Sequence, residues 1–420
     1  MGTKVNAFRE VSCKLIFLLY LVGVVFIPIE PNITNKIINI TGAFSFLLLL
    51  ISGEYRSYQR SILVLALGIF LLGALDLAWY GFYKTHDVIY KNGYRGYLEA
   101  GKMLVFSAFT FLLLSKQRFS HNIKSHVVAA SIVQGVMIGR SFYQSIYLHA
   151  ERIPLSAMGG DIGQMGAATV AAYMITFCAL YSSIVFLSLH SKYKWPLFYI
   201  NFALTLAAIM MTGTRSAFFT YPLMTVFLLF IQNQNQKKYL LKGLCGFMFL
   251  LIGCGLLFNK DITKRIDDFK SDMVSYSNKS NSMSSVGARL SMIQAGFASR
   301  PEGLHWQSLE QRAVKITDLS QRDSVYLGAT VFMDVHMHNE LAEAISTKGI
   351  FGIIFLVIFY FGLIHYCLRE RLYLLLVFPS SIILFGLSDV ITHAKPIPAS
   401  WIVCLMLSIA VLGKKKEDNI

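Results

Sequence analysis

Twelve apolar segments of 15 to 23 residues are the feature that most limits how this chain can fold. A helix needs roughly 20 mostly apolar residues to cross the hydrocarbon core of a membrane. The whole chain is 55% hydrophobic and 15% charged, which is typical of helical membrane proteins and not of soluble domains. The segments are 15–29, 37–52, 61–80, 99–115, 126–148, 167–189, 196–211, 217–231, 243–258, 349–367, 372–388 and 398–412. The sequence therefore predicts an all-α, polytopic membrane protein with about 12 transmembrane helices.

Basic residues in the connections predict the orientation of these helices. In a twelve-span topology they all fall on one side, which the positive-inside rule assigns to the cytoplasm together with both termini. The net charge of +15 has this source, so nucleic acid is not a predicted partner. The residues are Lys4, Arg9, Lys14, Arg56, Arg60, Lys116, Arg118, Lys124, Lys192, Lys194, Lys237, Lys238, Lys242, Arg369, Arg371, Lys414, Lys415 and Lys416.

One connection on the opposite side is long and divides the chain into three parts. We expect transmembrane helices one to nine in 1–258, an external loop in 259–348, and the last three spans with a cytoplasmic tail in 349–420. Long segments cross membranes regardless of their charge, so the basic residues of this loop do not contradict the orientation.

The long loop begins with an amphipathic pattern. An apolar stripe at helical spacing, formed by Ile262, Ile266, Phe269 and Met273, predicts a helix that lies along the membrane surface. The Ser/Asn-rich tract 275–289 predicts a flexible loop. We expect a second helix over 289–298 and a third that begins near 338 and continues into the tenth span.

Ionisable residues inside the spans point to a site, because they are costly in a membrane. In the predicted orientation all of them lie in the outer half of the bilayer, which favours a cavity open to the outside over a transport path. Side chains that reach to the interface would explain some of them equally well. The residues are Asp76, Glu99, Lys102, Arg140, Arg215 and Asp389.

The segment TGTRSAFF, residues 212–219, joins two spans by a very short turn and holds Arg215 at the outer membrane edge. A guanidinium beside the N-terminus of a helix suits an anionic group such as a diphosphate. The alternative is an arginine that anchors the turn to lipid headgroups.

The segment HMHNELAEAISTKGIFG, residues 336–352, leads into the tenth span. It carries His338-Asn339, a nine-residue spacer and the glycines of a G-x-x-G, Gly349 and Gly352. With TGTRSAFF, with GARLSMIQAGFASRPEG around Arg289, and with the long loop between spans nine and ten, it resembles the O-antigen ligase and polymerase superfamily of bacterial envelopes. Within this superfamily the overall pattern is most similar to the lipopolysaccharide O-antigen ligases.

The resemblance implies an inverting, metal-independent glycosyltransferase of the GT-C type in the bacterial inner membrane. The donor would be a polysaccharide on undecaprenyl diphosphate, and the acceptor a sugar hydroxyl of lipid A-core in the periplasmic leaflet. Such a transfer needs a base for the acceptor hydroxyl and positive charge for the departing diphosphate. His338 is the candidate base, and Arg215 and Arg289 are the candidate diphosphate ligands. We expect these three side chains to converge at the outer rim of the helices.

Other residues of the outer face have less certain roles on the sequence alone. Asp389 could orient the histidine or pair with an arginine, and Arg152 and Asn339 are further supporting candidates. His336 is two positions from His338 and would face elsewhere on a helix. A solvated helix face is expected for Glu340 and Glu343, and close packing of spans for the two glycines.

No cofactor is predicted. The outer loops contain no Asp-x-Asp pair and no metal-ligand spacing, so arginines in place of a divalent cation are consistent with the chemistry. The six cysteines lie in or beside apolar segments and predict neither disulfides nor zinc. Three functions remain open: the ligase; a polymerase, or a ligase with a protein acceptor, from the same superfamily; and a flippase or transporter of the lipid-linked sugar.

Overall fold

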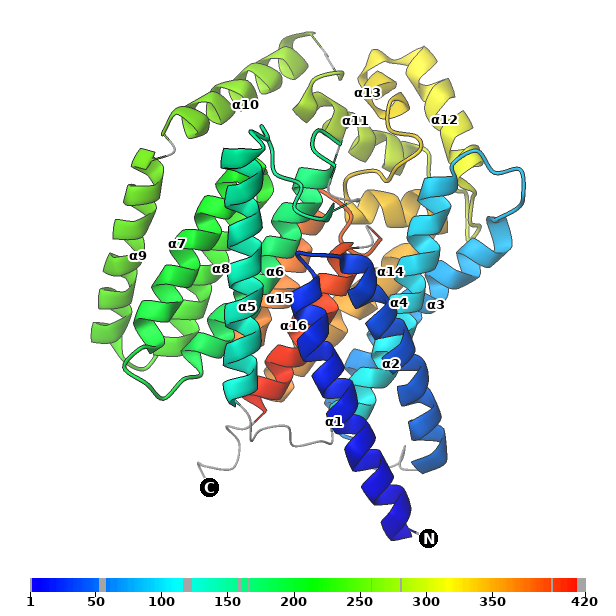
Figure 1. The fold of residues 1–420 in the computed structure, drawn as a ribbon. Helices are drawn as coiled ribbons and strands as arrows, with labels where there is room; N and C mark the ends of the chain where they lie inside the picture. The colour runs from blue at the N-terminus through cyan, green and yellow to red at the C-terminus, as the bar shows by residue number, and fades with distance from the viewer. Residues whose placement is uncertain are drawn as a thin grey trace.

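The computed structural model describes residues 2–52, 58–115, 123–157, 161–164, 166–257, 259–279, 282–393 and 396–413. In this part of the chain the regular structure is helical and no strand occurs (Figure 1). The helices before the long loop are α1 (Gly2–Phe26), α2 (Pro31–Ser52), α3 (Arg60–Tyr83), α4 (Lys91–Ser115), α5 (Ile123–Phe142), α6 (Ala167–Leu187), α7 (Lys194–Thr212), α8 (Arg215–Asn233) and α9 (Lys237–Leu257). The loop contains α10 (Asn259–Lys279), α11 (Ser285–Ala298), α12 (Leu309–Arg322) and α13 (Leu327–Thr330), and is followed by α14 (Glu340–Arg369), α15 (Val377–Gly386) and α16 (Pro396–Leu412).

Each of the twelve apolar segments overlaps one of these helices. Eight helices in the described residues are long and apolar enough to cross a membrane, namely α2, α3, α4, α6, α7, α8, α9 and α14. Two shorter apolar helical stretches, Tyr373–Gly386 and Pro396–Leu412, follow α14. The chain is thus a multi-pass membrane protein, and the number of twelve spans stays a prediction.

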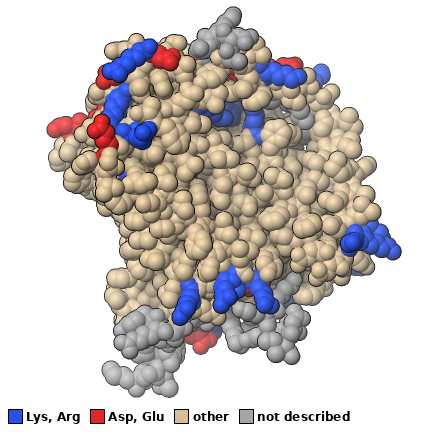
Figure 2. Space-filling model, turned by 180° about the vertical axis from the view of Figure 1, so that it is seen from behind, with Lys and Arg blue, Asp and Glu red and all other residues tan. Residues whose placement is uncertain are grey.

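The charged surface agrees with this description. Figure 2 shows Lys and Arg side chains near the lower edge and around the upper end, with a broad band between them that is largely uncharged. The connections α6–α7 and α8–α9 lie at the end of the bundle opposite the long loop, where α1 also begins (Figure 1). Of the basic residues used to predict the orientation, Arg56, Lys116, Arg118 and Lys414 to Lys416 lie outside the described residues.

Helix α6 forms the centre of the bundle. All of its residues are buried, and it packs against α5, α7, α8 and α16. Its small and hydroxyl side chains favour contact with other helices over contact with lipid, and hydroxyls such as those of Thr176 and Ser182 donate to carbonyls of their own helix. The helices around α6 then expose their own apolar faces outward, as expected for contact with lipid.

The long loop folds largely into helices. The apolar side chains of Ile266, Phe269 and Met273 are exposed on α10, so the predicted stripe exists, although the side chain of Ile262 lies outside the described part. The prediction of a flexible Ser/Asn-rich loop is wrong for most of the tract, because α10 continues to 279 and α11 begins at 285. The Ser284 hydroxyl accepts a hydrogen bond from the amide of Gly287 (3.1 Å), so a serine of this tract caps a helix.

The loop is held against the bundle through aromatic side chains. The Trp79 indole donates a hydrogen bond to the Gln307 carbonyl (3.0 Å), and the Tyr94 hydroxyl donates to Glu310 (2.6 Å). Helix α12, which carries Glu310, was not predicted; its signal is the capping box formed by Ser308 and Gln311.

A break in α14 accounts for the two glycines of the G-x-x-G. Gly349 has φ +57, a conformation that side chains disfavour, and a Cβ there would lie 2.9 Å from the carbonyl oxygen of His305. A Cβ on Gly352 would collide with the carbonyl of Ala344 in the same helix. The expectation that these glycines bring two spans together is therefore wrong: they permit the break and the close approach of the loop.

Candidate active site

The segment before α14 is held in a defined, non-helical conformation. His338 has φ +46, a left-handed backbone that is uncommon outside glycine and costs on the order of 1–3 kcal/mol. Asn339 caps α14, because its side-chain oxygen accepts a hydrogen bond from the amide of Ala342 (2.9 Å). Its amide nitrogen donates to the carbonyl of Leu387 (3.0 Å), which ties the start of α14 to the end of α15. Asn339 therefore supports the conformation of its neighbour His338.

Both histidines of this segment donate to one oxygen of Asp389. His338 Nδ1 lies 3.1 Å and His336 Nε2 lies 2.7 Å from Asp389 Oδ1. The expectation that His336 faces elsewhere is wrong, because residues 336–338 are not helical. With Nδ1 of His338 engaged by the carboxylate, its Nε2 is left with a lone pair for another proton.

Burial and charge set the protonation of this group. Burial disfavours the ionised form of Asp389, but the adjacent His338 and the hydrogen bonds from the imidazoles outweigh it and hold its pKa well below the usual value. For His336, burial opposes protonation, whereas the hydrogen bond to Asp389 and the carboxylate charge raise its pKa above the ordinary value. Asp389 is thus an anion near neutral pH.

A buried ion pair fixes the segment from the other side. Arg312, on α12, donates to Glu343, on α14 (2.9 Å), and both side chains are at most 2% exposed. Arg312 also donates to the carbonyl of Val335 (3.2 Å), and Glu343 accepts from the amide of Met337 (2.8 Å). The pair therefore forms hydrogen bonds with the backbone on both sides of His336 and holds it in place. The expectation of a solvated face for Glu343 is wrong, because α12 covers it.

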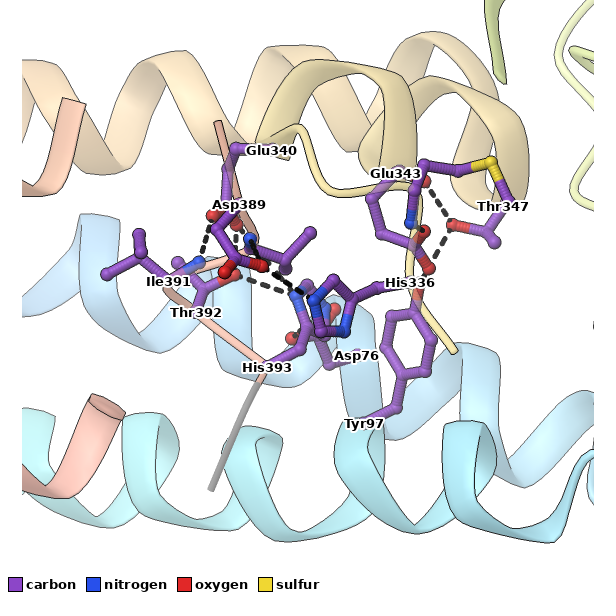
Figure 3. Close-up of polar contacts among 12 residues, drawn as sticks. Asp76, Tyr97, His336, Glu340, Glu343, Thr347, Asp389, Ile391, Thr392 and His393 are labelled. Atoms are coloured by element: carbon purple, nitrogen blue, oxygen red, sulfur yellow. Dashed lines mark hydrogen bonds and ion pairs between the residues drawn. The ribbon is translucent and has the colours of Figure 1, made fainter. Parts of the chain in front are cut away.

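Glu340 is also buried, which contradicts the same expectation. Its carboxylate accepts hydrogen bonds from the amide of Ile391 (2.6 Å) and from the hydroxyl of Thr392, as Figure 3 shows. Thr392 in turn contacts His393 Nδ1 (2.9 Å). These contacts join the start of α14 to the 389–393 segment that carries Asp389.

A second buried ion pair joins α14 to α3. Lys348 donates to Asp76 (2.6 Å), and His393 Nε2 lies 3.3 Å from the other Asp76 oxygen. Asp76 is 0% exposed, so the alternative of a side chain reaching to the membrane interface does not apply to it. The break in α14 at Gly349 comes directly after Lys348, whose side chain is buried against Asp76 of α3.

A cavity of about 830 Å³ brings most of the predicted site residues together. This volume lies in the upper part of the range for ligand pockets, roughly 300–1,000 Å³. Its walls come from the starts of α2 and α4, the segment before α6, α11, and the histidine segment. Of the predicted residues it is lined by His338, Asp389, Arg289 and Arg152.

The three predicted arginines have different surroundings. Arg289 lines the cavity from α11 and has no hydrogen-bond or ion-pair partner among the described residues, so its guanidinium is available to a ligand. Arg152 donates to the Thr212 carbonyl (2.8 Å) and to the Thr214 hydroxyl (3.3 Å), which fixes it to the α7–α8 turn. Arg215 is not among the cavity-lining residues; its guanidinium lies over the Phe269 ring, 5.7 Å from the centroid.

The chain is similar to known proteins over most of its length. Over 395 residues it is 29% identical to the O-antigen ligase of Escherichia coli (strain K12), covering 93% of this chain and 91% of that protein. The chain is thus similar to an O-antigen ligase over nearly its whole length. Over 370 residues it is also 21% identical to an uncharacterized protein of Haemophilus influenzae, covering 86% of this chain and 85% of that protein. No family model matches the chain.

The resemblance inferred from three short motifs is thereby confirmed over nearly the whole chain, and it supports an enzyme of the glycosyltransferase type. The similarity to this ligase does not show what each residue does, so the roles of single residues are argued from the geometry of the site. Sequence reasoning missed Arg312 and Glu343, because their pairing depends on the fold of the loop. The Asn339 cap, in contrast, has a sequence signal, since asparagine directly precedes the helical pattern.

The described residues contain one group that could hold a cation. His336, His338 and Asp389 bring three ligand atoms within 4.8 Å of one another. The same three residues are already joined by hydrogen bonds, so the arrangement is complete without an ion. The absence of a metal requirement remains a prediction.

Proposed function

We propose that this chain transfers a polysaccharide from undecaprenyl diphosphate to a sugar hydroxyl of lipid A-core, as an O-antigen ligase. The transfer would take place in the periplasmic leaflet of the inner membrane, with inversion and without a metal, in a GT-C-type enzyme whose termini are cytoplasmic. The similarity to the Escherichia coli ligase supports the overall reaction. The observation that carries the mechanism is that the His338–Asp389 pair lines one cavity with Arg289, whose guanidinium has no hydrogen-bond or ion-pair partner among the described residues.

His338 acts as the general base. Asp389 fixes the tautomer that protonates Nδ1, so Nε2 accepts the proton of the acceptor hydroxyl. The acceptor oxygen bonds to the anomeric carbon of the donor while the bond from that carbon to the diphosphate breaks. Undecaprenyl diphosphate leaves, and the proton on His338 passes to water in the open cavity.

Arginines stabilise the charge on the departing diphosphate. Arg289 supplies one positive charge on the cavity wall, and Arg152, held by the α7–α8 turn, supplies a second. Arg215 lies beside α10 and would meet the donor from that side. Guanidinium groups suit this role because they remain charged and bind two oxygens at once.

The His338→Ala variant tests the proposal. Loss of the base should lower the ligation rate by roughly 10²–10⁴-fold with the purified enzyme, because a positioned base contributes about this factor. In a ligase-deficient strain the variant should leave lipid A-core without polysaccharide. The matched control is His86→Ala, which removes an exposed histidine outside the cavity lining. This variant should restore the attachment of polysaccharide to lipid A-core in the same strain. Full activity of the His338→Ala variant would refute the mechanism.

The phenotype of a deletion separates the ligase from a polymerase. Loss of a ligase should leave long polymer on undecaprenyl diphosphate together with unsubstituted core. Loss of a polymerase should instead leave core that bears a single repeat unit, and that outcome would contradict the ligase assignment.

A further inference from the structure

The wall of the cavity formed by α4 carries two polar side chains that the proposed mechanism does not use. Asn92 and Arg95 both line the cavity, and residues three apart share one face of a helix. Neither has a hydrogen-bond or ion-pair partner among the described residues. Glu99, one turn further along, accepts a hydrogen bond from Asn35 Nδ2 (3.1 Å). Within the described part of the chain, two polar side chains without partners thus lie side by side on the cavity wall.

The backbone beneath these side chains is held firmly. Tyr94 donates to Glu310 (2.6 Å) and stacks on Trp79 at a centroid distance of 5.2 Å. A Cβ on Gly93 would lie 2.6 Å from Leu309, so α4 and the loop touch directly at this point. The start of α4 is therefore a fixed support, and a ligand that binds there would not have to order it first.

The α4 wall adjoins the histidine segment. The Tyr97 hydroxyl donates to Glu343, which also accepts from the amide of Met337 next to His338. A Cβ on Gly96 would lie 3.4 Å from the carbonyl of His393. The arginines assigned to the diphosphate come from other walls, the segment before α6 and helix α11.

This arrangement separates the two substrates. In an inverting transfer the acceptor and the leaving group lie on opposite sides of the reacting carbon, and the base stands on the side of the acceptor. We propose that Asn92 and Arg95 form the acceptor site and bind an anionic sugar of the acceptor glycan, phosphorylated or carboxylated. Arg95 would bind the anionic oxygens, and the Asn92 amide would bind a neighbouring sugar hydroxyl. This assignment rests on the proposed ligase function.

Steady-state kinetics of the full chain in lipid nanodiscs test the site. With donor saturating and acceptor varied, Arg95→Ala should raise the KM for acceptor about 10- to 100-fold, the factor expected for a lost hydrogen bond to a charged group. The kcat and the KM for donor should stay within about twofold of the wild type. Arg95→Lys should recover part of the affinity, because the charge remains but the paired geometry is lost. Asn92→Ala should have a smaller effect in the same direction.

Two controls make the result specific. Lys91→Ala removes the adjacent positive charge of α4, which does not line the cavity, and should leave both KM values unchanged. The acceptor is treated in two ways, with phosphatase or by reduction of its carboxyl groups. The treatment that removes the anion bound by Arg95 should make the KM for acceptor the same in the wild type and in Arg95→Ala. That treatment identifies the anion.

The outcomes separate this site from the function it rests on. If the wild-type chain transfers nothing to lipid A-core, the ligase function and the site both fail. If the wild type ligates but Arg95→Ala changes the KM for donor, or changes neither KM, the acceptor site alone is refuted. The acceptor site is also refuted if the KM of Arg95→Ala still exceeds that of the wild type with both treated acceptors.

Discussion

Asp389 shows how one residue can organise a site. A buried carboxylate is costly unless hydrogen bonds replace its water, and its Oδ1 accepts from two imidazoles and from the amide of Val390 (2.9 Å). These contacts keep Asp389 ionised and orient His338. They also raise the pKa of His336, so this imidazole keeps its charge to a higher pH than an ordinary histidine does.

The raised pKa of His336 predicts a pH-dependent stability. A group whose pKa is higher in the folded state stabilises it fully below its unfolded pKa, about 6.5, and loses this contribution as pH rises through the folded value. The melting temperature of the wild type should therefore exceed that of His336→Gln by more at pH 6 than at pH 9. Thermal melting of both proteins in the same detergent measures this, and a difference that grows with pH would contradict the ion pair.

Metal independence is testable at the same residues. Because the His336, His338 and Asp389 group is held by its own hydrogen bonds, extensive treatment with EDTA should leave the ligation rate unchanged. A rate lost on chelation and restored by added Zn²⁺ or Mn²⁺ would overturn this prediction.

At the scale of elements, the start of α14 is fixed because α12 of the loop lies against it. Replacement of Arg312 by Met leaves Glu343 as a buried, unpaired carboxylate, which typically costs about 3–5 kcal/mol of unfolding free energy. Arg312→Met should therefore lower the melting temperature and the kcat together, since the backbone around His336 loses its support. Arg322→Met, an exposed site on the same helix, should change neither. Equal stability of the two variants would show that the pair does not hold the segment.

The sequence predicts the helices that leave a local signal, namely a long apolar segment. It does not predict contacts between residues that lie far apart in the chain. Apolar segments long enough for helices located all the helices of the bundle, because lipid requires continuous hydrogen-bonded helices. Glu340 and Glu343 were misplaced, because their spacing on α14 resembles a solvated face and nothing local reveals the residues that cover them. The nine-residue spacer pointed to His338 and Gly349, which have positive φ just before α14 and at its break, and the role of His338 stays a prediction. The pairing of Lys348 with Asp76, in contrast, depends on residues far apart in the chain.

At the scale of the molecule, the proposed orientation has a direct test. Single cysteines at Ser191, in the α6–α7 connection, and at Asp318, on α12, should lie on opposite sides of the membrane. In a chain whose Cys245 and Cys254 are replaced by alanine, a membrane-impermeant maleimide applied to spheroplasts should label Asp318→Cys at once. Ser191→Cys should react only after lysis. Labelling of both sites in intact spheroplasts, or of Ser191→Cys alone, would contradict the topology.

The shared oxygen of Asp389 has a consequence for repeated turnovers. In the proposed mechanism His338 takes a proton from the acceptor, and His336 is a second hydrogen-bond partner of the same Asp389 oxygen. If the His338 ring turned toward solvent to release that proton, Asp389 would keep the hydrogen bond from His336. In the proposed cycle, His338 could therefore return to its neutral form between turnovers while Asp389 stays bound to His336.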